Sequence, residues 1–216
     1  MLLSTILSEL TWGMLTSIEI FLLTLLFSLP LGLVIAWGRM SKFAPLQWLM
    51  RIYISIMRGT PLMLQLIVVF FGPYYLFGLQ VSSDFRIVSV IIAFVLNYAA
   101  YFAEIYRGGI ESIPKGQYEA AQILGYSKYE TFFIIILPQV FKAVLPAITN
   151  EVITLVKDTS LSFVIAVPEM FTVAKEIAAS EASIMSLFAA GVFYYVFNII
   201  VAAVMEYIEK KLDYYD

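Results

Sequence analysis

The chain contains 216 residues with a formal net charge of -3, and it has neither histidine nor cysteine. Hydrophobic residues make up 62% of it and charged residues only 13%, whereas a soluble domain carries about a quarter charged residues. This composition excludes a soluble globular protein and indicates an integral membrane protein. The missing side chains exclude a thiolate nucleophile, an imidazole base, a disulfide and the usual zinc sites. No basic run is present, which argues against nucleic acid as a partner.

Five stretches of the chain are long and apolar enough to cross a bilayer as helices. A crossing of about 30 Å of hydrocarbon needs about 20 helical residues at about 1.5 Å each. The first stretch is too long for the core of a signal peptide, so we expect it in the mature protein. The predicted spans lie within a single transmembrane domain of residues 1–216, and they are residues 12–38, 59–80, 86–106, 130–156 and 183–208.

Two shorter segments do not fit as spans. Residues 43–57 carry apolar side chains at helical spacing, which predicts a helix at the inner membrane interface or an extension of a span. Residues 159–181 contain an apolar run that ends at Pro168 and then a mixed stretch. We interpret them as a partly re-entrant segment followed by a short outer helix.

The lysines and arginines predict the orientation, because cytoplasmic loops are enriched in them. Three cations fall on one side of the predicted spans: Arg86, Lys157 and Lys175. Nine fall on the other: Arg39, Lys42, Arg51, Arg58, Arg107, Lys115, Lys128, Lys210 and Lys211. This imbalance predicts an amino terminus outside the cell and a carboxyl terminus in the cytoplasm.

A short helix is predicted between the third and fourth spans, over residues 114–125. Pro114 suits its first turn and Gly125 a left-handed stop, while Ser127 and Glu130 have the spacing of a capping box that starts the next helix. The side chains of Tyr118, Ala121 and Leu124 share one face, and the small Ala120 and Ala121 would let another surface approach. The alternative is a connecting helix that merely lies on the bilayer.

Polar residues inside predicted spans need a partner or a function, because charges are costly there. Asn97 lies at the middle of the third span, where it either bonds to another helix or faces a transport pathway. Glu104 and Arg107 are three residues apart on one face, which predicts a structural ion pair.

The outer end of the fourth span carries the most suggestive cluster. If the helix continues, Glu151, Thr154 and Asp158 lie on one face, with Asn150 and Lys157 on the adjoining face. An α-amino acid carries a carboxylate and an ammonium, so a lysine with two acids would suit it, and the surplus acid could meet a cationic side chain. The alternative is a solvated outer loop in which Lys157 and Asp158 face water.

At these positions the sequence resembles a known family. Glu119-Ala120-Ala121, three residues, Gly125, nine residues, Ile135, one residue and Leu137-Pro138 match the signature loop of the membrane-spanning subunits of ABC importers. The segments 58–62, with Gln65, and 103–109 resemble the polar amino acid permeases of that family. The resemblance extends from about residue 12 to the end of the chain.

The resemblance implies an all-α membrane protein with five transmembrane helices, the fold of type I importer permeases, in a bacterial plasma (inner) membrane. It implies that the helix at 114–125 is a coupling helix that docks in a cleft of a cytoplasmic ATPase. The docking residues would be Tyr118, Glu119, Ala120, Ala121, Leu124 and Gly125. ATP and Mg would be bound by that partner, because this chain has no Gly-x4-Gly-Lys-Ser/Thr loop.

We therefore expect a permease subunit without catalytic residues, metal or cofactor of its own. Its expected partners are an ATPase dimer, a second permease subunit that is either an identical copy or a relative, and an extracytoplasmic substrate-binding protein. The expected cargo is a polar amino acid, either basic or glutamine, bound by Asn97, Glu151, Thr154, Lys157 and Asp158. The alternatives are an ion-coupled secondary carrier or channel, which would usually show an inverted repeat, and a membrane-embedded enzyme.

Overall fold

The computed structural model describes residues 3–80 and 82–212, and every regular element in these two ranges is helical. Among these described residues, four helices are long and apolar enough to cross a membrane, or up to five if one bent pair is counted as a span. The elements in chain order are α1 (Leu3–Arg39), α2 (Ala44–Gly59), α3 (Leu62–Phe77), α4 (Phe85–Ser112), α5 (Lys115–Ile123), α6 (Lys128–Glu130), a π-helical turn η1 (Thr131–Ile136), α7 (Leu137–Asp158), a 3-10 helix η2 (Thr159–Ile165), α8 (Met170–Ser180) and α9 (Met185–Leu212).

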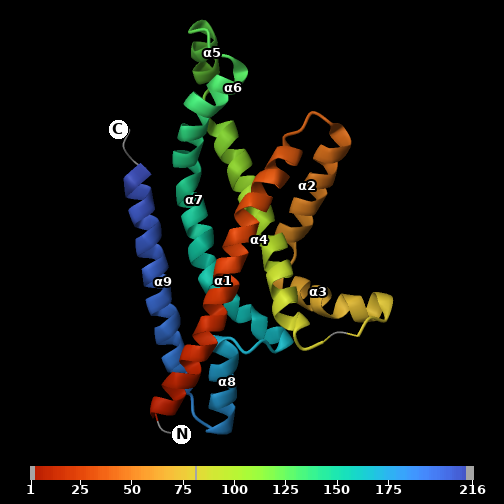
Figure 1. Cartoon of the computed structure of the whole chain (residues 1–216), viewed down its shortest axis with the longest axis vertical. Coiled ribbons are helices and arrows are strands. Elements are labelled where there is room, and N and C mark those ends of the chain that lie inside the picture. Colours follow the sequence, from red (N-terminus) through yellow and green to blue (C-terminus); the bar gives the residue numbers. More distant parts are fainter. Residues whose placement is uncertain (1–2, 81, 213–216) are drawn as a thin grey trace.

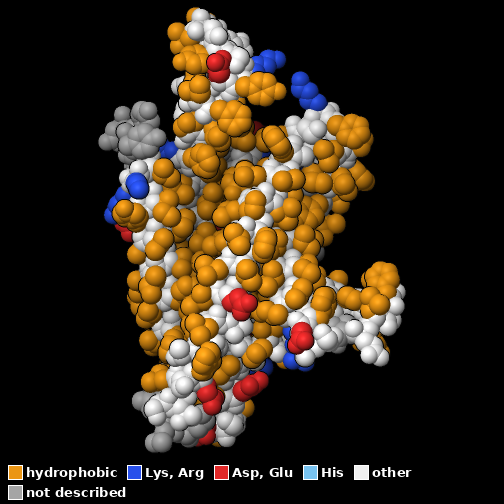
Figure 2. Space-filling view, in the orientation of Figure 1, with side chains coloured by type: hydrophobic (Ala, Val, Ile, Leu, Met, Phe, Trp, Pro, Cys, Tyr) orange, Lys and Arg blue, Asp and Glu red, His pale blue; other side chains and the backbone are white. Residues whose placement is uncertain are grey.

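The long helices α1, α4, α7 and α9 run between two ends of the molecule (Figure 1). One end carries α5 and α6, where α1 and α9 finish, and the other carries α8, where α1 begins. Figure 2 shows that the middle of one face is almost entirely apolar and that charged side chains gather toward the two ends. Such a surface suits contact with lipid, so the predicted class, an all-α membrane protein, is confirmed by the structure.

The second predicted span, residues 59–80, contains α3, whose 16 residues are fewer than the about 20 that a straight crossing needs. Helix α3 is joined to α2 by a bend of 109°. Pro61 causes the break, because proline has no backbone N–H and disfavours the helical conformation for the residue before it. Thr60 is accordingly extended, with φ -120° and ψ 146°. The segment predicted as an interface helix, residues 43–57, therefore forms the first arm of the bent pair, α2.

The bend also corrects the position of Arg58. Its helix, α2, begins near the end of the molecule where α1 finishes and runs back toward the opposite end. Its 16 residues extend about 24 Å at about 1.5 Å per residue, so Arg58 lies far from Arg39 and Lys42. The predicted orientation groups Arg58 with these two cations. The set of nine cations on the predicted cytoplasmic side is therefore reduced to eight.

Helix α4 is the centre of the fold. It packs along α1 and contacts α2, α3 and α7, and its buried side chains include the small Ala93, Ala99, Ala100 and Ala103. Lipid supplies no hydrophobic drive for helix association, so membrane helices depend on close packing at small residues. Gly109 shows how close this packing is, because a Cβ atom placed there would lie 2.1 Å from Cγ1 of Val144 on α7.

A second, smaller core lies at the end that carries α8. It contains Leu10 and Met14 of α1, Met170 and Ile177 of α8, and Ala190 of α9. The predicted short helix within 159–181 is present as α8, and the 3-10 helix η2, which continues α7, stands where the partly re-entrant segment was predicted.

Glu169 joins the three helices of this smaller core. It is fully buried and caps α8, accepting hydrogen bonds from the backbone N–H groups of Phe171 and Thr172, both at 2.8 Å. Its carboxylate also accepts bonds from the hydroxyls of Tyr194 on α9, at 2.9 Å, and Ser17 on α1, at 3.4 Å. Burial raises the pKa of the Glu169 carboxyl, and these hydrogen bonds oppose that shift by stabilising the ionised form.

Candidate functional site

The predicted coupling helix is α5, which projects from one end of the molecule (Figure 1). Pro114 stands immediately before it as the N-cap residue, one position earlier than a first-turn proline. Gly125 follows it in the left-handed conformation, with φ +85°. The N–H groups of Gly125 and Tyr126 bond to the carbonyls of Gln122 and Ala121, both at 3.0 Å. This pattern is a Schellman motif, and it ends α5 sharply.

The next helix begins with the predicted capping box. The hydroxyl of Ser127 accepts a bond from the Glu130 N–H at 3.3 Å, and the Glu130 carboxylate accepts one from the Ser127 N–H at 2.8 Å. Local hydrogen bonds therefore determine both the end of α5 and the start of α6, which leads through η1 into α7.

The residues predicted to share one face of α5 have different surroundings. Ala121 is buried and Tyr118 is half-buried against the chain's own core. In contrast, Glu119 and Ala120 are exposed and Leu124 has 74% of its surface exposed. Among the predicted docking residues of α5, Glu119, Ala120 and Leu124 are therefore open to another molecule, whereas Tyr118 and Ala121 hold α5 on its own chain.

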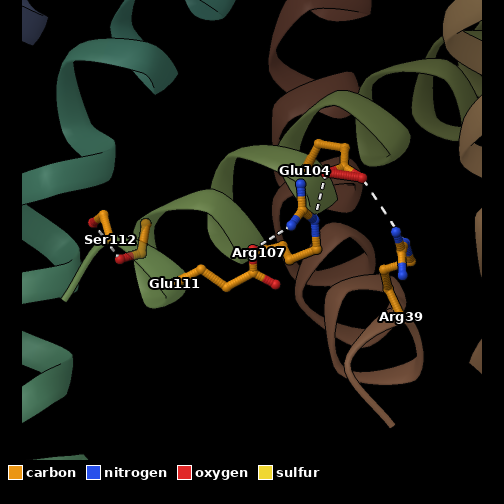
Figure 3. Close-up of polar contacts among 6 residues, drawn as sticks. Arg39, Glu104, Arg107, Glu111 and Ser112 are labelled. Carbon is orange, nitrogen blue, oxygen red and sulfur yellow. Dashed lines mark hydrogen bonds and ion pairs between the residues drawn. The ribbon is translucent and has the colours of Figure 1, made fainter. Parts of the chain in front are cut away.

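An ion-pair network lies where α4 approaches α5 (Figure 3). The predicted pair is present, with the Arg107 Nε atom 2.6 Å from a Glu104 oxygen. Arg107 also pairs with Glu111 one turn later. Arg39, at the end of α1, lies 4.0 Å from the other Glu104 oxygen. The network thus ties the ends of α1 and α4 together just before the chain enters α5.

Asn97 is almost fully buried in the middle of α4, with 5% of its surface exposed. Its amide nitrogen donates to the carbonyl of Met57 at 2.9 Å and to the side-chain oxygen of Gln65 at 3.0 Å. The Gln65 amide in turn donates to the Met57 carbonyl at 3.0 Å and the Thr60 carbonyl at 3.2 Å. Asn97 therefore makes the bond to another helix that was one of its two predicted roles, and it holds the α2–α3 bend in place.

The α7 cluster is arranged as the helical spacing predicted. The helix continues to Asp158, so Glu151, Thr154 and Asp158 share a half-buried face, while Asn150 and Lys157 are exposed. The hydroxyl of Tyr98 on α4 donates to Asp158 at 2.7 Å. The Thr154 hydroxyl donates to the carbonyl of Asn150 at 2.9 Å. The structure thus brings Asp158 into contact with α4 and leaves Lys157 exposed on the adjoining face.

Two residues in this region were missed from the sequence. The Arg58 Cζ atom lies 5.2 Å from the centre of the Tyr101 ring, which is the geometry of a cation–π contact. The sequence prediction places Arg58 with the cytoplasmic charges, because it does not include the helix break after that residue. The Gly-Thr-Pro sequence after Arg58 is the signal for this break. It ends α2 and so places Arg58, the last charged residue of that helix, beside α4.

A family model for the binding-protein-dependent transport system inner membrane component matches residues 28–214. The chain belongs to this family. It is therefore a permease subunit, the membrane component of an ABC importer, and the resemblance read from its signature loop is confirmed.

Individual relatives agree with this assignment. The permease subunit is 40% identical over 209 residues to the L-cystine transport system permease protein TcyB of Bacillus subtilis, covering 95% of this chain and 87% of that protein. It is 37% identical over 201 residues to the arginine transport system permease protein ArtQ of the same organism, covering 93% and 90%. A crystal structure of an amino acid ABC transporter with histidines superposes with a TM-score of 0.86 at 27% identity, covering 94% of each chain.

The permease subunit has a groove of about 650 Å³ between α7 and the end of α9, lined by residues that include Ile135, Gln139 and Leu212. None of the predicted substrate residues lines this groove. Across residues 3–80 and 82–212, no group of three or more acidic side chains could hold a metal ion.

Proposed function

We propose that this permease subunit carries polar amino acids, either basic ones or glutamine, through a site that includes Asn97, Glu151, Thr154, Lys157 and Asp158. The observation that carries the proposal is that Asp158 and Arg58 both reach the middle of α4, where the Tyr98 hydroxyl donates to Asp158 at 2.7 Å and the Arg58 guanidinium lies over the Tyr101 ring. Ionisable groups in membrane-spanning segments are rare and usually mark a substrate or ion pathway. The relatives named for arginine and cystine support an amino acid as the cargo.

Transport is driven by ATP hydrolysis on a partner ATPase dimer, which supplies both the nucleotide site and the Mg. The ATPase grips α5, and closure of its two subunits moves α5 and the attached α4 and α7, giving alternating access. Glu119, Ala120 and Leu124 contact the ATPase, while Tyr118, Ala121 and Gly125 fix the angle of α5. The exposed position of the first three supports this division.

The assembly contains a second, identical permease subunit, and a substrate-binding protein delivers cargo to the end that carries α8. The permease lies in a bacterial inner membrane with its amino terminus outside and its carboxyl terminus in the cytoplasm. The half-buried face of α7 that carries Glu151, Thr154 and Asp158 fits this assembly, because a second subunit would complete the surroundings of these polar residues.

The test is transport by the reconstituted complex. The permease is purified with its partner ATPase and substrate-binding protein and placed in liposomes, and uptake of radiolabelled L-arginine, L-histidine and L-glutamine is measured. We expect uptake of at least one of these amino acids, and only when ATP is present on the side of the membrane that carries the ATPase. Uptake by the permease alone under an ion gradient would instead establish the secondary carrier. Absence of uptake of all three, with a fourth amino acid transported, would overturn the proposed substrate class.

A further inference from the structure

The π-helical turn η1 separates α5 and α6 from the long helix α7. Within η1 the backbone N–H of Leu137 donates to the carbonyl of Phe132, five positions earlier. The N–H of Thr131, where the turn begins, still donates to the Ser127 carbonyl, four positions earlier, as in an α-helix. Single π-helical turns inside longer helices are rare, and they frequently occur at functional sites.

Pro138, the second residue of α7, explains why the helix widens at this position. In an α-helix the N–H of residue 138 would donate to the carbonyl of Ile134, but proline has no N–H and its ring clashes with that carbonyl. The carbonyl of the next residue, Ile135, accepts a hydrogen bond from the side-chain amide of Gln139 at 2.7 Å. Proline and a side chain bonded to the backbone thus both act on the last part of η1.

The wide turn changes the direction in which α5 faces. Successive residues of an α-helix are rotated by about 100° around its axis, and a π-helical turn contains one residue more than the α-helical turn it replaces. Compared with an uninterrupted helix, the side chains before η1 are therefore rotated by about 100° relative to those of α7. The rotation also reaches α5, because the Gly125 stop and the Ser127–Glu130 capping box join α5 to α6 through local hydrogen bonds.

Packing keeps this rotated arrangement in place. Ile136, the last residue of η1, is fully buried in the core around α4, and Tyr118 of α5 packs against the same core. Helix α5 also contacts η1 directly. Phe133 and Ile134 lie on the open side of the turn, each 59% exposed. The turn therefore accommodates its extra residue on the exposed side, and the buried contacts of η1 and α5 are both kept.

We propose that Pro138 is a positioning residue of the transport reaction: it maintains η1 as a π-helical turn and thereby sets the direction in which the exposed side of α5 faces the ATPase. Without the proline, the backbone closes into a continuous α-helix and α5 rotates with it, so that the exposed side no longer faces the ATPase cleft. This inference rests on the proposed function, because it requires that an ATPase grips α5.

The test removes the proline and then compensates for the rotation. Pro138→Ala supplies the missing N–H, and we expect it to lower uptake per ATP hydrolysed in liposomes roughly five-fold or more, the scale of a lost coupling between two sites. Deleting Phe133 as well removes the extra residue, so a continuous α-helix then leaves α5 in its original direction and should restore most of the ratio. Pro146→Ala is the matched control, because Pro146 lies inside the α-helical part of α7, and it should leave the ratio unchanged.

A distance measurement on the same permease–ATPase complexes reports the rotation itself. The chain contains no cysteine, so spin labels can be attached at Tyr129→Cys and Phe141→Cys, two exposed positions on either side of η1. The distance between the labels, measured by electron paramagnetic resonance, should change in Pro138→Ala and return to its original value when Phe133 is also deleted. Alanine favours a helix more than proline does, so thermal denaturation should show Pro138→Ala to be no less stable than the unmodified protein.

Three outcomes would overturn the inference and leave the proposed function intact. An unchanged label distance in Pro138→Ala would show that the proline does not maintain the turn. A changed distance with full uptake per ATP would show that the direction of α5 does not matter. A loss that deletion of Phe133 does not restore would show that rotation is not its cause. The proposed function fails separately, if the unmodified complex shows no ATP-dependent uptake.

Discussion

Gly125 is the residue whose backbone most directly controls the position of α5. Its φ of +85° is in the left-handed region, while a Cβ atom placed on it would meet no other atom within 4 Å. Space is therefore available for a side chain, and only the backbone conformation resists one. An L-residue in this conformation costs about 1–2 kcal/mol, and asparagine less than most.

We predict that Gly125→Val reduces transport per ATP hydrolysed, because the strained motif reorients α5 relative to η1 and α7. Gly125→Asn should retain more coupling, since asparagine tolerates the left-handed conformation. The measurement is the ratio of uptake to ATPase activity in liposomes with equal amounts of permease. Gly116→Ala is the control, because Gly116 lies inside α5 with equal free space and ordinary helical backbone. Full coupling in Gly125→Val would show that the Schellman motif does not set the coupling geometry.

The contact between α4 and α7 depends on one of two adjacent glycines. A Cβ atom on Gly109 would lie 2.1 Å from Cγ1 of Val144, whereas one on Gly108 would meet nothing within 4 Å. Substitution by alanine at each of these two positions therefore separates the effect of packing on stability from the effect of helix propensity.

We predict that Gly109→Ala destabilises the permease by about 1–3 kcal/mol through overpacking. Gly108→Ala should be neutral or stabilising by up to about 1 kcal/mol, because alanine favours the helix more than glycine does. Thermal denaturation in detergent, followed by size-exclusion chromatography, measures both. Adding Val144→Ala to Gly109→Ala should restore part of the loss, since it removes the clashing methyl group. A Gly109→Ala protein as stable as Gly108→Ala would contradict the close contact.

The elements divide into those that sequence predicts and those that only tertiary contacts determine. The α5 boundaries and the capping box at Ser127 follow from local rules, and so does the face shared by Glu151, Thr154 and Asp158. Pro61 is an equally local signal for a break, but its 109° angle is held by Asn97, which bonds to Met57 from 40 positions away. Hydropathy averaged over about 20 residues crosses that break without detecting it, and Arg58 was misplaced for the same reason.

On the scale of the whole molecule, the absence of cysteine in the sequence permits a direct test of orientation. We predict that a membrane-impermeant maleimide labels Glu176→Cys, exposed on α8, in sealed right-side-out vesicles. Lys211→Cys, exposed near the end of α9, should be labelled only after the vesicles are permeabilised. The unmodified chain is the control and should take up no label. The reverse pattern would mean that α5 faces away from the cytoplasm and would exclude its contact with a cytoplasmic ATPase.

The two cores of the molecule share one helix. The first part of α1, with Leu10 and Met14, belongs to the core around α8 and α9, whereas Ile20 and Ile35 belong to the core around α4. Ser17, between these parts, is bonded to Glu169. If α1 is rigid, the core around α8 and α9 and the core around α4 would rotate together about Ser17. If they are to rotate independently during the transport cycle, then α1 must flex between Met14 and Ile20, a stretch of less than two helical turns.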